Sequence, residues 1–392
     1  MKILLTNPFC WPAVRRGAER FMAELAAYLA KRGHEVTILT SHAGPREVTR
    51  QNGVLTLCEQ QITGPFLKVA GITPQTSFLI HAWRLLREEH SFDVVHCLNS
   101  ADAFGACMAG LPNKTALIAL MAGMPFGRLL RRQPWESVIV RVAVRRASRV
   151  IVLSRAAAEK LQNIFHRSGD LLGIPCDMNT FTLREGRDLA RPRILGAGAF
   201  SERRKGALVL IRAFELVKKK VPGAILQYSG AMTDVMKNHL LASVNPGIHE
   251  DIQFSGVGKL ESLPDLYGQA AVTVLPSVGE AFGMVLVESL ACGTPVVGSQ
   301  DGGIPDIVQD GMGTLFDPGS NRHEPANPEG LAKAILSTLD LYRDPHLHRR
   351  CRENVQRFSW EELGPRIEAL YAQAAEDCAR SCTSSSSWTR QS

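Results

Sequence analysis

The sequence predicts an α/β fold of two doubly wound parallel-sheet domains, and two observations support this prediction. Short apolar strands alternate with stretches of helical periodicity along most of the chain, which is typical of parallel sheets covered by helices. The chain of 392 residues is also too long for one ordinary core and suits two α/β domains of similar size. The alternation fades over the charged segment 182–193 and then restarts. We therefore expect the domain boundary within this segment.

The expected elements begin with an apolar strand and a helix that Gly33 is placed to cap. In the first half, strands are expected at 2–6, 35–39, 94–97, 115–120 and 149–153, and helices at 17–31 and 75–88. In the second half, strands are expected at 193–198, 224–229, 252–254, 272–276 and 295–298, and helices at 206–219, 232–241, 262–269, 283–292 and 360–379. The resulting division is an N-terminal Rossmann-like domain at 1–185, a C-terminal one at 186–357, a C-terminal helix at 358–380 and a serine-rich, disordered tail at 381–392.

Composition and charge narrow the class of protein. The chain is 45% hydrophobic and 21% charged, as expected of a soluble globular protein, and no apolar run reaches the roughly 20 residues of a membrane span. Nine scattered cysteines with no Cys-x-x-Cys pair indicate neither a disulfide framework nor a zinc site and fit a reducing cytoplasm. A net charge of +7 suits an anionic partner such as a nucleotide diphosphate, a lipid headgroup or a nucleic acid.

The most informative stretch runs from Leu275 to Glu288, where a strand enters a glycine-containing turn and a helix starts near Gly283. A helix N-terminus at the carboxyl end of a parallel strand favours a bound phosphate. Glu280 lies just before this helix, and Glu288 lies five residues inside it, about 7.5 Å from its start. Two glutamates at this spacing also occur by chance. However, Glu288 stands within an apolar run, where an unpaired carboxylate would be costly to bury, and this favours a functional role.

With these residues the chain resembles the large GT4-type family of retaining glycosyltransferases, also called glycosyltransferase group 1. Glu280 and Glu288 match its Glu-x7-Glu motif. The matching flanks are Pro276-Ser277, Phe282-Gly283, Cys292 to Val297 and Gly302 to Asp306. Further matches, which extend the resemblance over nearly the whole chain up to Gln373, are Gly17-Ala18-Glu19, 32–36, 93–96, Asp177 with Phe181, Lys205-Gly206 and 358–360.

The resemblance implies the GT-B fold, in which two Rossmann-like domains face each other across a cleft and the last helix crosses back to the N-terminal domain. The donor would occupy the C-terminal domain, with Glu280 on the sugar hydroxyls and Glu288 on the ribose. The backbone of Phe282, Gly283 and Met284 would lie near the sugar and the diphosphate. Glu280 is therefore a candidate catalytic residue.

Lys205, in a turn with Arg203 and Arg204, matches the family lysine that binds the donor diphosphate. A cation there would stabilise the charge that develops on the leaving group, so Lys205 is the second candidate catalytic residue. The alternative is a solvated basic turn. Ala199 departs from the family, which usually has an arginine at this position, so half of the phosphate clamp is missing unless Arg203 or Arg204 replaces it.

The N-terminal half contributes weaker candidates. Gly17 follows a loop that the resemblance places near the diphosphate, although Arg16 stands where a loop glycine is common. His96 and Asn99 are candidates for the acceptor or sugar side, and a buried core role for His96 is an equal alternative. The family often has a histidine two residues after His96, where this chain has Leu98.

A basic segment at 128–149 is partly amphipathic and contains Glu136 as its only acid. Such a stretch can hold an enzyme on an anionic membrane surface, and a solvated arginine face is an equal alternative. Nucleic-acid binding is not expected, because aromatic residues are few and no recognition motif accompanies the charge. The arginines of the segment are Arg128, Arg131, Arg132, Arg141, Arg145, Arg146 and Arg149.

The sequence therefore predicts a glycosyltransferase that moves a sugar from a nucleotide-diphosphate donor to an unidentified glycan, lipid-linked or small-molecule acceptor, with retention of configuration. No Asp-x-Asp motif is present, so we expect no metal, and the glycine pattern at 196–201 is too weak a fingerprint for a nicotinamide cofactor. The expected location is the cytoplasm, with association to its membrane face left open. The alternatives are a degenerate relative that binds a nucleotide sugar or a partner protein without turnover, and a GT-B epimerase or phosphorylase.

Overall fold

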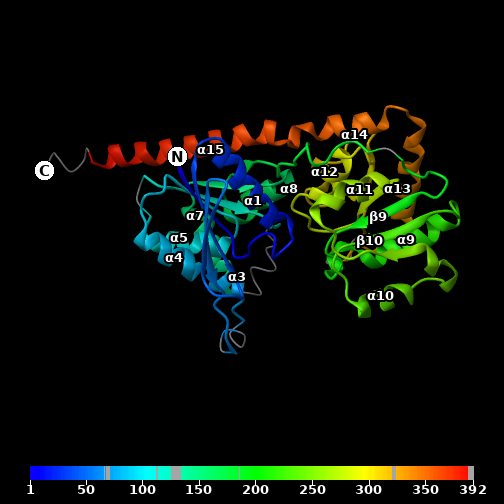
Figure 1. Cartoon of the computed structure of the whole chain (residues 1–392), viewed down its shortest axis with the longest axis horizontal. Coiled ribbons are helices and arrows are strands. Elements are labelled where there is room, and N and C mark those ends of the chain that lie inside the picture. Colours follow the sequence, from blue (N-terminus) through cyan, green and yellow to red (C-terminus); the bar gives the residue numbers. More distant parts are fainter. Residues whose placement is uncertain are drawn as a thin grey trace. The chain divides into compact units, whose positions relative to one another are not determined.

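The structure is a computed structural model that describes residues 1–65, 67, 71–111, 114–124, 134–184, 186–319 and 324–386. It divides into two units, each with its own sheet and helices (Figure 1). Unit 1 consists of Met1–Gly173 and Gly364–Ser392, and unit 2 of Ile174–Leu363.

Unit 1 contains an eight-stranded sheet in the order β3-β4-β2-β1-β5-β6-β7-β8, in which every pairing except β3 with β4 is parallel. Its strands are β1 (Lys2–Thr6), β2 (Glu35–His42), β3 (Glu47–Gln51), β4 (Val54–Gln60), β5 (Val94–Cys97), β6 (Ala116–Met121), β7 (Arg149–Val152) and β8 (Asp170–Leu171). Its described helices include α1 (Gly17–Lys31), α3 (Pro74–Ser77), α4 (Leu79–Glu88), α5 (Ser100–Ala109), α7 (Pro134–Arg146) and α8 (Arg155–Phe165).

The antiparallel pair β3 and β4 was not among the expected elements. Asn52 and Gly53 connect the two strands with positive φ angles of 50° and 82°. Asn-Gly is the preferred sequence for a two-residue hairpin turn, because both positions require this left-handed backbone. The signal was therefore present in the sequence, although β3 itself is fully exposed and carries no apolar alternation.

Unit 2 contains a six-stranded, all-parallel sheet in the order β11-β10-β9-β12-β13-β14. Its strands are β9 (Arg193–Ala197), β10 (Ile225–Ser229), β11 (Ile252–Phe254), β12 (Val272–Leu275), β13 (Val296–Ser299) and β14 (Gly313–Phe316). Its α-helices are α9 (Ala207–Lys218), α10 (Asp234–Leu241), α11 (Leu263–Gln269), α12 (Met284–Ala291), α13 (Pro328–Asp340) and α14 (Leu347–Val355). Short 3-10 turns lie at Arg203–Lys205, Pro246–Asp251, Leu260–Ser262, Ile304–Asp306, Leu341–Arg343 and Gln356–Phe358. The core lies between the sheet and helices such as α9 and α13.

The break between the units lies at Gly173 and Ile174, upstream of the expected position at 185/186. The irregular segment that follows is tied to unit 2 by its side chains and backbone. Arg187 donates to the Thr294 hydroxyl at 2.6 Å and to the Cys292 carbonyl at 2.9 Å. Arg352 of α14 donates to two backbone carbonyls of the segment. These contacts are distant in sequence, so composition could not reveal them.

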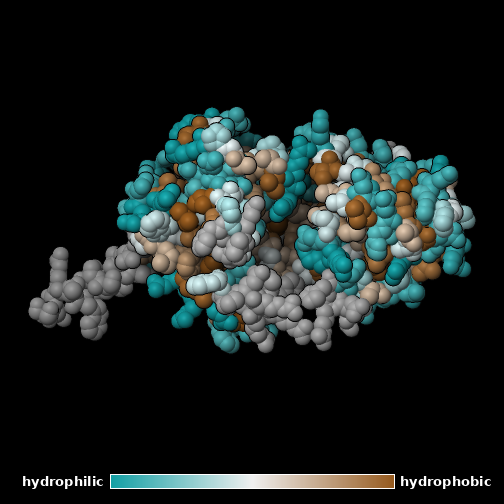
Figure 2. Space-filling model, turned by 90° about the horizontal axis from the view of Figure 1, so that it is seen from below, coloured by the Kyte–Doolittle hydropathy of each residue, from teal (hydrophilic) through white to brown (hydrophobic). Residues whose placement is uncertain are grey.

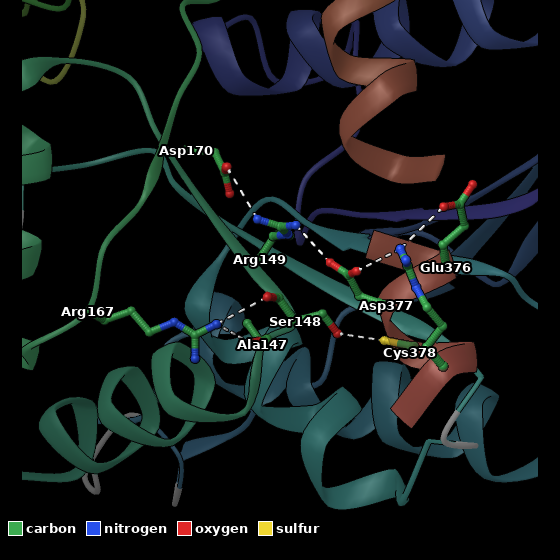
Figure 3. A network of polar contacts seen from close by, with 9 residues as sticks. Ala147, Ser148, Arg149, Arg167, Asp170, Glu376, Asp377 and Cys378 are labelled. Carbon is green, nitrogen blue, oxygen red and sulfur yellow. Dashed lines mark hydrogen bonds and ion pairs between the residues drawn. The ribbon is translucent and has the colours of Figure 1, made fainter. Parts of the chain in front are cut away.

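The last helix, α15 (Trp360–Ser386), is longer than expected, and from Gly364 onward it belongs to unit 1. Asp377 accepts a hydrogen bond from Arg149 at 2.8 Å, and the Cys378 sulfur lies 3.3 Å from the Ser148 hydroxyl (Figure 3). Arg149 also lies 3.8 Å from Asp170, so one arginine joins β8 to the helix. The expected tail at 381–392 coincides with helix up to Ser386, and residues 387–392 lie outside the described part of the chain.

Glu368 of α15 contacts three polar side chains of the N-terminal part of unit 1. Its carboxylate accepts hydrogen bonds from the Tyr28 hydroxyl at 3.0 Å and from the Arg32 guanidinium at 3.1 Å, and it lies 2.9 Å from His34 Nε2. Burial acts to raise the pKa of Glu368, but the hydrogen bonds from His34, Tyr28 and Arg32 outweigh it and lower the pKa. The ionised carboxylate is therefore favoured in the folded protein.

Glu368→Gln should destabilise the protein at neutral pH by about 1.5 kcal/mol, because charge-assisted hydrogen bonds are lost. A carboxylate whose pKa is lowered by folding stabilises the folded protein at pH values above its pKa in the unfolded chain, which is about 4.3. This contribution is lost as the pH falls through the pKa of the folded protein. Thermal melts of the variant and the wild type should therefore converge as the pH falls through the lowered pKa of folded Glu368. The exposed Glu376→Gln on the same helix is the matched control and should change little. A difference that persists in acid would contradict the assignment.

None of the described helices combines the length and the apolar character needed to cross a membrane.

Candidate functional site

The direction of the chain reverses in unit 2 between β9 and β12. From β9 the chain runs outward through β10 and β11, and from β12 it runs the other way through β13 and β14. Loops that follow two such neighbouring parallel strands diverge at their carboxyl ends, and ligands of open α/β sheets bind there. The two loops, 198–206 and 276–283, carry Lys205 and Glu280.

Backbone contacts hold these loops together. The Val278 N–H donates to the Arg204 carbonyl at 2.9 Å, and the Gly303 N–H donates to the Glu280 carbonyl at 2.8 Å. A Cβ atom at Gly302 would lie only 2.3 Å from the Glu280 carbonyl oxygen, and Gly302 has a φ of +63°. Only glycine fits this approach. The Gly-Gly-Ile-Pro run that the sequence marked therefore supports the backbone of Glu280.

Lys205 and Glu280 form an ion pair. Lys205 Nζ lies 2.6 Å from Glu280 Oε2, although the residues are 75 positions apart, and the lysine side chain is only 12% exposed. Arg204 lies 3.6 Å from the same oxygen and donates to Glu202 at 2.7 Å. Arg203 is exposed. The structure thus places two of the three predicted cations beside the predicted carboxylate, which argues against a merely solvated basic turn.

The charge state of Glu280 follows from this arrangement. Burial acts to raise its pKa, but the charge and hydrogen bond of Lys205, assisted by Arg204, outweigh burial and lower the pKa. Glu280 is therefore an anion at neutral pH. An ionised carboxylate accepts hydrogen bonds strongly, and a lysine has three N–H donors, so Lys205 can hold Glu280 and still meet a further oxygen.

The helix that follows this loop, α12, begins at Met284 after Gly283, which has a φ of +120°. Phe282 is buried and packs edge-on against Phe358, with ring centroids 5.3 Å apart. Packing of the Phe282 ring therefore fixes where the helix starts. The backbone of these residues lies at the carboxyl end of β12, next to the loop that carries Glu280.

Glu288 lies inside α12 and is only 2% exposed. Its carboxylate accepts a hydrogen bond from the Tyr267 hydroxyl at 2.6 Å. The expectation from the sequence was that a carboxylate in an apolar run needs a partner, and Tyr267 of α11 is one. Sequence reasoning missed Tyr267, because no local pattern links a tyrosine on one helix to a glutamate on the next.

The candidates of the N-terminal half lie in unit 1, around the reversal between β1 and β5. Gly17 is the exposed first residue of α1, which follows β1. Asn99 follows β5, and its side-chain oxygen accepts the Ala101 N–H at 3.0 Å as the N-cap of α5. Asn99 therefore has a local structural role that accounts for its residue type.

His96 lies in β5 with no exposed surface. Its Nδ1 atom is 2.6 Å from the Tyr371 hydroxyl of α15, and burial lowers its pKa to about 3, so the imidazole is neutral. This environment favours the core role over the site role. The partner is 275 positions away in the sequence, so only the tertiary structure could reveal this contact.

Asp102 is a buried residue that sequence reasoning missed. It lies in the first turn of α5, is 0% exposed and accepts a hydrogen bond from the Thr6 hydroxyl at the end of β1. Burial raises its pKa to about 8, although hydrogen bonds from Thr6 and the backbone act in the other direction. The signal was an acidic residue inside the apolar helix start Ala101-Asp102-Ala103.

Comparisons with known proteins decide the family. A profile of Glycosyltransferase Family 4 matches residues 15–175, and a profile of Glycosyl transferases group 1 matches residues 191–340. A D-inositol 3-phosphate glycosyltransferase from Xylanimonas cellulosilytica is 30% identical over 92% of each chain. The chain belongs to the GT4-type glycosyltransferases. It is therefore an enzyme that transfers a sugar.

Solved structures show the same fold. A sucrose-phosphate synthase from Thermosynechococcus elongatus superposes with a TM-score of 0.79 at 21% identity, covering 95% of this chain and 98% of that chain. The Anabaena protein HepE in complex with UDP-glucose has a TM-score of 0.68 at 18% identity, covering 98% and 100%. The predicted GT-B fold is confirmed.

Across the described ranges, no three His, Cys, Asp or Glu side chains gather as metal ligands would.

Proposed function

We propose that this GT4-type enzyme transfers a sugar from a nucleotide-diphosphate donor to an acceptor with retention of anomeric configuration and without a metal or cofactor. The observation that carries the proposal is the cluster of Lys205, Arg204 and Glu280 at the chain reversal of unit 2. Cations bind a diphosphate, and a carboxylate accepts hydrogen bonds from sugar hydroxyls. The cluster provides both kinds of group on two adjacent loops. The likeness to a protein in complex with UDP-glucose supports the same donor class.

In the proposed reaction the bond between the anomeric carbon and the diphosphate oxygen breaks, while the acceptor oxygen bonds to that carbon from the same face. The acceptor hydroxyl proton passes to the departing diphosphate oxygen. Lys205 stabilises the negative charge on the leaving diphosphate, and Arg204 takes the place of the arginine that Ala199 replaces. Glu280 accepts hydrogen bonds from donor sugar hydroxyls. The start of α12, at Phe282, Gly283 and Met284, lies beside the phosphates.

The second candidate is a relative that binds a nucleotide sugar without turnover, which Ala199 and Leu98 motivate. The deciding experiment incubates the purified chain with a panel of nucleotide-diphosphate sugars, with and without candidate acceptors, and measures the nucleoside diphosphate released. We expect release from at least one donor, unaffected by EDTA. Binding of a donor in calorimetry with no release from any of them would favour the second candidate. Inversion at the anomeric carbon, read by NMR of the product, would contradict retention.

We also propose that the enzyme works in the cytoplasm, where an acceptor can be presented in part by an anionic membrane surface. The eight cysteines whose side chains the structure describes, from Cys10 to Cys378, are free, which suits a reducing compartment. Fractionation of cells that produce the protein should recover it from the cytoplasm and from membranes washed at low salt. Recovery only from an oxidising compartment would contradict this location.

Glu288→Ala should weaken nucleoside diphosphate binding by about 1.5 to 3 kcal/mol, because the proposed hydrogen bond from the ribose to a charged group is lost. Titration calorimetry measures this change. Tyr267→Phe is the matched control, since it removes the hydroxyl bonded to Glu288 and keeps the carboxylate. An unchanged affinity in a folded Glu288→Ala protein would remove the ribose role. Equal losses in both variants would show that the pair only supports the fold.

A further inference from the structure

The outward side of α7 carries an apolar stripe in unit 1. Trp135 is 80% exposed and Val138 is 48% exposed, and Val142 continues the stripe at the spacing of one helix face. The opposite side of the helix, which includes Ala143 and Val144, is buried against the unit. Apolar side chains thus lie on both sides of α7, so this helix is not the ordinary amphipathic helix of a soluble domain.

Arginines flank this stripe. Arg141, Arg145 and Arg146 are exposed, and neither Arg145 nor Arg146 forms an ion pair with a carboxylate in the described ranges. Burial raises the pKa of Cys107 on α5 to about 11, and the nearby Arg146 acts in the other direction. Helix α5 packs against α7, and Met108 near the end of α5 is 59% exposed.

We define the α7 face as Trp135, Val138, Val142, Arg141, Arg145 and Arg146. Three further arginines of the basic segment, Arg128, Arg131 and Arg132, lie outside the described residues. Hydrophobic and hydrophilic side chains lie side by side on unit 1 as viewed from below (Figure 2). Arg141 donates to the Ser137 hydroxyl at 3.2 Å and lies over the Phe165 ring, so the free cations of the face are Arg145 and Arg146. A surface that mixes an exposed tryptophan with such arginines is unlike the charged, apolar-poor surface of a typical soluble helix.

Hydrogen bonds and ion pairs fix the C-terminal end of α7, which carries part of the α7 face. Arg167 donates to the carbonyl of Ala147 at 2.6 Å and to that of Ser148 at 3.2 Å (Figure 3). It also donates to the carbonyl of Arg145 at 3.2 Å. Arg149, three residues beyond the helix, is fixed by Asp377 and Asp170. The packing of the helix therefore fixes its orientation and keeps the side chains of the α7 face at the surface.

We propose that the α7 face docks on a membrane that contains anionic lipids. Tryptophan prefers the boundary between headgroups and acyl chains, where its ring is buried and its N–H is hydrated. Arginines around an apolar stripe pair with anionic headgroups, and the net charge of +7 adds long-range attraction. A second copy of the chain would need an acidic patch on the same face to pair with these arginines, and α7 carries only Glu136 beside them. The proposal rests on the membrane association put forward in the proposed function, and it is independent of the sugar-transfer chemistry.

The test is sedimentation of the full chain with phosphatidylcholine vesicles prepared with and without phosphatidylglycerol. Binding should require the anionic lipid and fall as salt rises. Arg145→Glu should weaken binding more than ten-fold, because it removes one favourable charge and adds an unfavourable one, at about five-fold for each charge. Arg349→Glu, at an exposed position of α14 in unit 2, is the matched control and should bind as the wild type does.

A second pair of variants tests the apolar stripe. Val138→Ser should weaken binding several-fold, whereas Val235→Ser should not, although Val235 on α10 is 81% exposed. The tryptophan fluorescence should shift to the blue on anionic vesicles, and Trp135→Phe should remove most of that shift. The proposal would be overturned if the protein bound both kinds of vesicle equally or bound neither. It would also be overturned if the control variants lost as much vesicle binding as the α7 variants. A dimer that Val138→Ser dissociates would assign the face to a second copy instead.

Discussion

Lys205→Ala should lower the rate of sugar transfer about 100- to 1000-fold, or roughly 2.7 to 4 kcal/mol in the barrier. Ala199 removes the arginine that usually shares the diphosphate, so Lys205 is the best-placed cation for the leaving group. Its ammonium group lies 2.6 Å from Glu280 and is largely buried. It therefore needs little rearrangement when negative charge develops on the leaving group. Steady-state release of nucleoside diphosphate measures the rate, and thermal melts verify folding.

The neighbouring arginines are the matched controls for Lys205→Ala. Arg204→Ala should cost less than Lys205→Ala, because Arg204 lies 3.6 Å from Glu280 and is 34% exposed. Arg203→Ala should cost least, because this side chain is exposed. If Lys205→Ala kept the wild-type rate while either arginine variant lost it, our assignment of this loop would be wrong. Wild-type rates in all three variants would place the phosphate site elsewhere.

Glu280→Gln should separate turnover from diphosphate binding. The amide keeps a hydrogen-bond acceptor but loses the charge, so turnover should fall about 10- to 100-fold as charge-assisted hydrogen bonds to the sugar weaken. Binding of a free nucleoside diphosphate, which has no sugar, should be unchanged or tighter. The reason is that Lys205 loses the carboxylate with which a phosphate must share it. Calorimetry and turnover on the same preparation give both quantities.

Two outcomes for Glu280→Gln would contradict this division of roles. Weaker nucleoside diphosphate binding with an unchanged melting temperature would mean that Glu280 acts by positioning Lys205. An unchanged turnover would exclude contact with the sugar. Glu280→Asp keeps the charge on a shorter side chain, so it should restore part of the turnover if the charge matters and little if the distance matters.

The sequence by itself determined the α/β class, the two-domain organisation and the GT4-type family. Alternating apolar strands and helical periodicity are local properties, so the expected elements from β1 to β13 correspond to observed ones with small shifts at their ends. The glycines at 279, 283, 293 and 302 also follow a local rule, since each has a positive φ angle that favours glycine. The Asn52-Gly53 turn was equally local and would have revealed the hairpin β3 and β4.

Only the tertiary structure decided which side chains meet. Lys205 joins Glu280 because β9 and β12 are neighbours in the sheet, and nothing in either loop specifies that neighbour. Glu288 meets Tyr267, and His96 meets Tyr371, through contacts between separate elements. Burial sets the protonation of His96 and Asp102, and burial depends on everything packed around them. The sequence gives the identity of each residue, but the hydrogen-bond partners and the burial of a side chain depend on long-range packing. The charge state of the site could therefore be obtained only from the folded chain.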